Sequence, residues 1–248
     1  MEEGFTLSKT EFIAYLHCSF KFYLLKELNN DTKSGATWIT DLTDHRPVIQ
    51  EGLIWHQWFD DFYNNYGEDI RNGVYPNING KDEILKRKFI DLEIERYNNS
   101  PQFWEPIGTE FGLSDNYLKG KIDRIDKVNE QGHCRIIEYK KNPGFFDKEE
   151  LLFYTLLLSN TLPHPELPGI IQVTQIGIYY YNIGEFNIDS INLNERQKFE
   201  QFLYNIRKEM LQPNLAKNQN CNFKRTNCLY HEICRRIKIE KTDILSDF

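Results

Sequence analysis

The chain has 248 residues, of which 40% are hydrophobic, enough for one large globular domain with its own core. Its longest apolar run, residues 151–158, is far shorter than the roughly 18 residues of a membrane-spanning helix. The start, Met1-Glu2-Glu3-Gly4, carries acid where a secretory signal carries base. We therefore expect no membrane, secreted, collagen-like or disordered class, and a soluble protein of the cytoplasm.

The charge is unevenly distributed. Thirty basic and 37 acidic residues give a net charge of −7, which argues against indiscriminate binding to nucleic acid. Residues 1–206 hold 21 basic and 32 acidic residues (−11), whereas residues 207–241 hold 9 and 3 (+6). The basic segment is either a solvated surface run or a lobe that faces phosphates.

The predicted elements begin with a capping box, Ser8 and Glu11, which opens a helix whose apolar residues keep helical spacing to Leu24. A loop is expected at 30–47, and the other predicted helices cover residues 48–66, 82–97, 149–158 and 194–211. Short runs of strand type separated by turn residues cover 104–112, 117–128, 134–139, 170–181 and 185–193. The first three strands should form an antiparallel meander. The fold class is α+β, or mixed α/β, with extra structure at both ends.

One stretch carries residues suited to catalysis. Glu138 and Lys140 share one face of a predicted strand and Tyr139 points the other way, because side chains alternate along a strand. If the preceding strand pairs through the short turn, Asp123 lies beside Glu138. Two carboxylates and an amine would then meet, and carboxylate oxygens are ligands that Mg²⁺ prefers. From spacing alone, a half-buried sheet with a charged solvent face remains the alternative.

The pattern of Asp123 followed 15 residues later by Glu138-Tyr139-Lys140 resembles the PD-(D/E)XK nuclease superfamily. More narrowly, the chain resembles the RecB-like nucleases and, among them, the CRISPR-associated iron–sulfur single-stranded-DNA exonucleases. The supporting features stand in the same order: the helix 52–56, Glu110, the helix 150–154, and one early with three late cysteines. The resemblance implies a restriction-endonuclease-like core sheet flanked by helices over 48–200. That core would belong to a single RecB-like domain (1–248) whose cysteine-bearing terminal elements, 1–30 and 207–241, join at a metal site.

The resemblance also implies roles for individual residues. It implies that Mg²⁺ or Mn²⁺ is bound by His56, Asp123, Glu138 and the backbone carbonyl of Tyr139. Lys140 would be the catalytic lysine. Imidazole binds transition-metal ions better than hard cations, so His56 would tilt the preference slightly toward Mn²⁺.

Two further residues are implied in supporting roles, each with a plainer alternative. Tyr154 would help to place the substrate strand, or would only pack within an apolar helix. Glu110 would support the site, or would only face solvent. His56 also has an alternative, as a core or surface residue beside aromatic neighbours. Arg124 and Asp126 are expected to be structural.

The cysteines are interpreted separately. Five cysteines, an odd number, without an export signal argue against a disulfide framework. The resemblance implies a [4Fe–4S] cluster on Cys18, Cys221, Cys228 and Cys234. The spacing from Cys221 to Cys228 is longer than in the family, and Arg225 stands where the closer cysteine would fall. Zinc, for which His231 offers an imidazole, and unmetallated thiols remain alternatives. Cys134 is expected to be simply buried.

One position departs from the family. Glu150 stands where glutamine is usual, and an ionised carboxylate repels a phosphate, which puts substrate handling by this helix in question. Lys141 and Lys148 are candidates to offset its charge.

Together these features predict a metal-dependent deoxyribonuclease that hydrolyses phosphodiester bonds, with an exonuclease preferring single-stranded DNA implied by the resemblance. Its partners would be DNA and a CRISPR integrase or a helicase, in antiviral defence or DNA repair. One alternative is a non-catalytic DNA-binding or assembly subunit of a CRISPR adaptation or recombination complex. Another is a metal-stapled nucleic-acid binder that uses residues 207–241.

Overall fold

The computed structural model describes residues 6–19, 22 and 47–211. The chain divides into two compact units, one of residues 1–9 and 37–211 and one of residues 10–36 and 212–248. In the second unit, the described part is the helix α1 (Lys9–His17) after its first residue, together with Cys18, Ser19 and Phe22. Its Phe12 and Ala14 are buried, and Tyr15 meets Phe22 edge to face. Among the described residues, no helix combines the length and apolarity that crossing a membrane requires.

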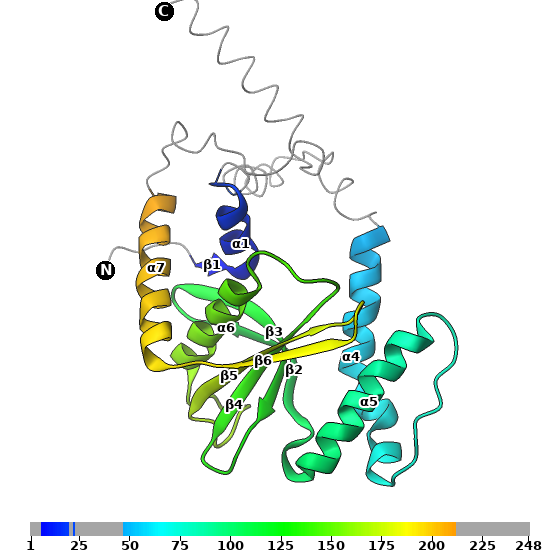
Figure 1. Cartoon of the computed structure of the whole chain (residues 1–248). Coiled ribbons are helices and arrows are strands. Elements are labelled where there is room, and N and C mark those ends of the chain that lie inside the picture. Colours follow the sequence, from blue (N-terminus) through cyan, green and yellow to red (C-terminus); the bar gives the residue numbers. More distant parts are fainter. Residues whose placement is uncertain (1–5, 20–21, 23–46, 212–248) are drawn as a thin grey trace, which may run out of the picture. The chain divides into compact units, whose positions relative to one another are not determined.

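The first unit is a mixed sheet with helices on both faces (Figure 1), which confirms the predicted mixed α+β class. Its strands are β1 (Leu7–Ser8), β2 (Pro106–Ser114), β3 (Leu118–Lys127), β4 (His133–Lys140), β5 (Gln172–Tyr180) and β6 (Glu185–Ser190). The strands β2, β3 and β4 form the predicted antiparallel meander. The parallel pair β4–β5 is joined through helix α6 (Asp147–Thr161). Both central strands are buried over long runs, as expected for parallel strands covered on two faces.

One face of the sheet carries helices α4 (Pro47–Arg71) and α5 (Glu83–Asn99), and a short 3-10 turn, η2 (Pro101–Phe103), precedes β2. The core on this face is unusually aromatic. Phe59 of α4 stacks on Tyr139 of β4 with ring centroids 4.0 Å apart, and Trp55 stacks on Tyr181. The other face carries α6, buried from Glu150 to Leu158, and then α7 (Leu193–Leu211). These contacts fix α4 and α6 against opposite faces of β4.

The structure differs from the expected elements chiefly in three places, and the other elements differ by up to three residues at their ends. Helix α4 begins at Pro47, inside the predicted loop, and continues to Arg71, since proline is well tolerated in the first turn of a helix. The predicted strand at 104–112 begins only at Pro106. Two residues before α1 form β1, a strand that a capping-box interpretation does not contain. The remaining loop at 30–46 and the end of the first predicted helix lie outside the described residues.

A single edge of β3 is shared by two strands. β2 pairs with β3 from Lys119 to Asp126 on one edge. On the other edge, β1 pairs with Leu118 and Lys119, and β4 pairs with residues 124–127. Among the described strands, residues 120–123 therefore have no partner on that edge, and we call this stretch the β3 gap.

The face of β3 toward α4 and α5 holds a buried ion network. Arg124 contacts Asp126 at 2.6 Å and Glu93 of α5 at 2.9 Å, and all three side chains are 1% exposed. Arg96 joins the network by contacts to Glu93 and Asp126. The expected structural role of Arg124 and Asp126 is confirmed.

Replacing Arg124 tests how strongly this network holds the sheet to α5. Arg124→Met removes one of the two arginines that pair with the buried carboxylates of Glu93 and Asp126, so the free energy of unfolding should fall by about 3–5 kcal/mol in urea titrations. The control is Arg87→Met, which breaks the exposed pair with Glu83 and should leave the free energy of unfolding nearly unchanged. A similar small loss for both variants would contradict this role.

Candidate metal centre

The candidate site lies at the β3 gap, where three carboxylates face one another on adjacent strands. Glu110 of β2 lies between the pairs Thr109↔Arg124 and Phe111↔Ile122, and so opposite Asp123. One position beyond the pair Arg124↔Ile137, the register places Asp123 opposite Glu138 of β4. Because side chains of directly opposed residues share a face, the predicted proximity of Asp123 and Glu138 agrees with the observed register.

The side chain of Asp123 accepts a hydrogen bond from a backbone N–H at the β3 gap. The N–H of Tyr139 donates to Oδ2 of Asp123 at 2.8 Å. The carboxylate thus replaces a main-chain ladder bond and is fixed in orientation, while its other oxygen, Oδ1, lies 3.3 Å from Nδ1 of His56. The carbonyl of Tyr139 as a metal ligand remains a prediction.

His56 reaches the site from α4 and bridges two carboxylates. Its Nδ1 lies 3.2 Å from Oε1 of Glu110 and 3.3 Å from Asp123. Burial lowers the pKa of His56, but the hydrogen bonds to Asp123 and Glu110 outweigh it and raise the pKa to about 10. The hydrogen bond from His56 in turn lowers the pKa of Glu110. His56 therefore contacts two carboxylates in addition to its aromatic neighbours.

Ligand atoms of His56, Glu110 and Asp123 all lie within 4.8 Å of one another, close enough to hold a metal ion. The structure thus brings Glu110, expected only as a supporting residue, into the candidate ligand set. Its φ of 45° lies in the left-handed region, which is costly for a residue with a side chain and is often found at functional sites.

Glu138 provides the test of whether a cation fits. Its side chain is 2% exposed, and its Oε1 has no hydrogen-bond partner within the described part of the chain. Burial raises the pKa of Glu138 well above its ordinary value, and the charge of Asp123 raises it further. A buried carboxylate oxygen with no donor, beside a second carboxylate, suits a divalent cation.

Lys140 points into the same site, on the side of α6. Its ammonium donates to Oε2 of Glu150 at 2.5 Å. Glu150 also forms an ion pair with Lys9, the residue that directly follows β1. Burial alone would raise the pKa of Glu150, but Lys9 and Lys140 lower it overall. The negative charge at position 150 is thus offset by Lys9 and Lys140.

The two other lysines considered for that role have different partners. Lys141 pairs with Glu51 of α4 at 2.6 Å, and Lys148 pairs with Glu195 of α7 at 2.6 Å. Neither ion pair involves Glu150.

Sequence inspection missed Lys9. It stands next to Ser8 at an apparent helix start, and its partner is 141 positions away. The available signal was the glutamate at position 150, whose buried charge requires a cation, but no local pattern indicates which lysine supplies it.

Tyr154 lies beneath the site and is only 2% exposed. Burial raises its pKa, and the nearby carboxylates of Glu138, Glu150 and Asp123 add to the effect. Its ring packs against Gly120, in the β3 gap, and the ammonium of Lys9 lies 5.7 Å from the ring centre. In this structure Tyr154 therefore fills the gap, and a contact with the substrate remains a prediction.

The cysteine site is not described by the structure. Cys221, Cys228 and Cys234 lie outside the described residues, and Cys18 is a half-buried free thiol. Cys134 is fully buried, as expected, and burial raises its pKa to about 12.

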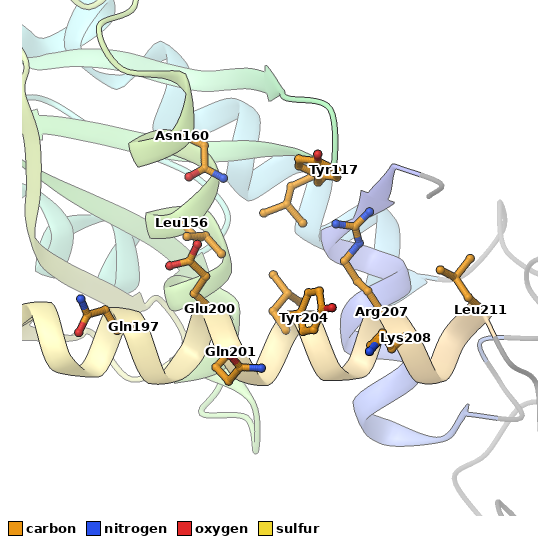
Figure 2. Close-up of a pocket in the computed structure, with 12 residues that line it drawn as sticks. Tyr117, Leu156, Asn160, Gln197, Glu200, Gln201, Tyr204, Arg207, Lys208 and Leu211 are labelled. Atoms are coloured by element: carbon orange, nitrogen blue, oxygen red, sulfur yellow. The ribbon is translucent and has the colours of Figure 1, made fainter. Parts of the chain in front are cut away.

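A separate pocket of about 480 Å³ lies beside α6 and α7 (Figure 2). Its lining includes Tyr117, Asn160, Tyr204 and Arg207, and none of the metal-site residues. The guanidinium of Arg207 lies 4.8 Å from the ring centre of Tyr117. The pocket is therefore separate from the candidate site at the β3 gap.

A family model described as the PD-(D/E)XK nuclease superfamily matches residues 6–235, which is most of the chain. The chain belongs to the PD-(D/E)XK nuclease superfamily. A search of curated proteins finds none that matches the sequence. Members of this superfamily are nucleases that use divalent metal ions, and the acidic residues at the β3 gap are consistent with such an ion.

Gly120 in the β3 gap lies in close contact with the ring of Tyr154. A Cβ there would lie 2.7 Å from Cε1 of the buried Tyr154 ring, so Gly120→Ala should reduce the free energy of unfolding by about 1–3 kcal/mol. The control is Gly112→Ala on β2, where a Cβ meets nothing within 4 Å. Equal stability of the two variants in thermal or urea unfolding would show that Tyr154 does not fill the gap.

Proposed function

We propose that this protein is a metal-dependent deoxyribonuclease that hydrolyses phosphodiester bonds, acting as an exonuclease on single-stranded DNA. The observation that carries the proposal is the group of His56, Glu110 and Asp123 at the β3 gap, with Glu138 opposite Asp123 in the strand register. A non-catalytic assembly subunit would have no physical need for a buried carboxylate oxygen without a donor.

The contacts of these residues support the following roles. Asp123, Glu138 and His56, together with Glu110, would hold Mg²⁺ or Mn²⁺, which polarises a phosphate and lowers the pKa of water when bound. Asp123 is held in place by the N–H of Tyr139. The ammonium of Lys140 has three N–H donors, of which one reaches Glu150, so it can also donate to a phosphate oxygen as negative charge develops.

The finer assignment rests on the resemblance of the motifs. We propose a RecB-like nuclease with a [4Fe–4S] cluster on Cys18, Cys221, Cys228 and Cys234, acting with a CRISPR integrase or a helicase. Cys18 supports this assignment because it is a free thiol and is therefore available as a cluster ligand. The excess of basic residues at 207–241 supports contact with DNA phosphates.

Two isosteric variants test the metal centre. Asp123→Asn and Glu138→Gln should each lower the rate of Mg²⁺- or Mn²⁺-dependent cleavage of an oligonucleotide by at least about 100-fold. Glu138→Gln should leave the metal-free thermal stability unchanged or higher, because it removes a buried charge whose ionisation is unfavourable.

The control for these variants is Glu130→Gln, which removes an exposed carboxylate paired with Lys127. EDTA should stop cleavage by the wild type. Cleavage that survives in Asp123→Asn or in EDTA would contradict the assignment, and a folded wild type that binds DNA without cutting it would favour the assembly subunit.

Substrate topology tests the exonuclease assignment. Linear single-stranded DNA should be degraded, closed circular single-stranded DNA of the same sequence should resist, and a blunt duplex should react more slowly. The duplex is slower because each stacked base-pair step costs about 1.4 kcal/mol to open. Gel analysis of end-labelled and circular substrates gives the result, and cutting of the circle would show endonuclease action instead.

A further inference from the structure

We propose that Lys9 is a second lysine of the site, which binds a phosphate group of the substrate strand together with Lys140, and that Glu150 is the positioning residue that holds both. This inference rests on the proposed function and adds a phosphodiester-binding pair to it. The ligand class is the phosphodiester group of a single-stranded nucleic acid.

Glu150 forms ion pairs with both lysines. The two carboxylate oxygens of Glu150 are divided between the lysines, with Oε1 facing Lys9 and Oε2 facing Lys140. One carboxylate therefore brings two ammonium groups to the same place. Each ammonium has three N–H donors and donates one hydrogen bond to Glu150, so each has further donors to offer a phosphate oxygen.

Lys9 lies directly after β1, at one end of the β3 gap. Lys9 follows Ser8, which pairs with Lys119 at one end of the β3 gap, and Glu138 follows Ile137, which pairs with Arg124 at the other end. The lysine thus enters the gap from the side opposite β4. Its side chain is 27% exposed, so part of it remains accessible from solvent.

The carboxylates around Lys9 affect the pKa of its amine. Burial lowers the pKa of Lys9, but the charges of Glu138, Glu150 and Asp123 outweigh it and keep the amine protonated. With Lys9 present, two lysine charges stand against the single carboxylate of Glu150, so the group keeps an excess of positive charge for a phosphate. Without Lys9, the charge of Lys140 would be balanced by Glu150 alone.

The test compares four variants with a matched control. Lys9→Gln removes the proposed contact, Lys9→Arg keeps its charge, Glu150→Gln releases both lysines, and Lys9→Gln combined with Glu150→Gln restores charge balance without restoring the contact. The control, Lys148→Gln, removes a lysine two residues from Glu150 that pairs with Glu195 instead.

Steady-state kinetics on a single-stranded oligonucleotide give the first readout. Lys9→Gln should raise KM by roughly tenfold or more, the size of one lost charge-assisted hydrogen bond, with a smaller change in kcat. Lys9→Arg should stay within about threefold of the wild type. Glu150→Gln should lower kcat because Lys140 loses its orientation. The double variant should unfold like the wild type, yet keep the raised KM.

Equilibrium binding of the same fluorescein-labelled oligonucleotide in EDTA, at several salt concentrations, gives a readout independent of cleavage. Lys9→Gln should reduce the slope of log K against log salt by about one, and Lys148→Gln should not. An active wild type whose KM and salt slope are unchanged by Lys9→Gln would overturn the inference and leave the nuclease assignment intact. A wild type that never cuts, but whose salt slope falls in Lys9→Gln, would overturn the proposed function and keep the phosphate contact.

Discussion

The site depends on the way in which two strands share one edge of β3. β1 covers the start of that edge and β4 covers its end, so within the part of the chain that the structure describes the backbone at residues 120–123 has no strand partner there. A carboxylate in such a gap can accept a backbone N–H that would otherwise bond to a strand, and Asp123 does this with Tyr139. The interruption of the sheet thus fixes Asp123, admits Lys9 after β1 and leaves room for Tyr154 beneath Gly120.

The alternation of side chains separates two charged clusters on the two faces of the same strand. On the face toward α4 and α5, Arg124 and Asp126 form a closed network whose charges are satisfied by one another and by α5. One residue away, Asp123 belongs to an open cluster in which an oxygen of Glu138 has no hydrogen-bond donor among the residues that the structure describes. Buried charges that are fully paired stabilise position and orientation, whereas incompletely paired ones are suited to binding a cation or a phosphate. The paired network of Arg124 and Asp126 therefore stabilises the strand on which Asp123 lies.

The aromatic core explains how a histidine on a distant helix is held at the sheet. Phe59 stacks on Tyr139, whose own N–H holds Asp123. His56, three residues earlier on the same helix, meets the ring of Tyr139 edge to face. The contacts that bury the helix are thus the same ones that align its histidine with the carboxylates.

Much of this arrangement could be predicted from the sequence. The meander, the helices and the shared face of Glu138 and Lys140 follow from periodicity and turn residues, which are local properties. The proximity of Asp123 and Glu138 follows from one short turn. Lys9 and the short β1 could not be predicted, since their pairings with Glu150 and with Leu118 join residues more than 100 positions apart and leave no periodic signal. The place of Glu110 among the ligands depends on a left-handed backbone conformation that its residue type does not predict.

The most direct test of the central claim is to locate the metal itself. A crystal of the full-length protein soaked in MnCl₂ should show an anomalous difference peak at the β3 gap, within coordinating distance of Asp123, Glu138 and His56. The His56–Asp123 contact should then be replaced by bonds from both side chains to the ion. A peak confined to other parts of the surface, with His56 still bridging Glu110 and Asp123, would contradict the assignment of this site as a metal centre.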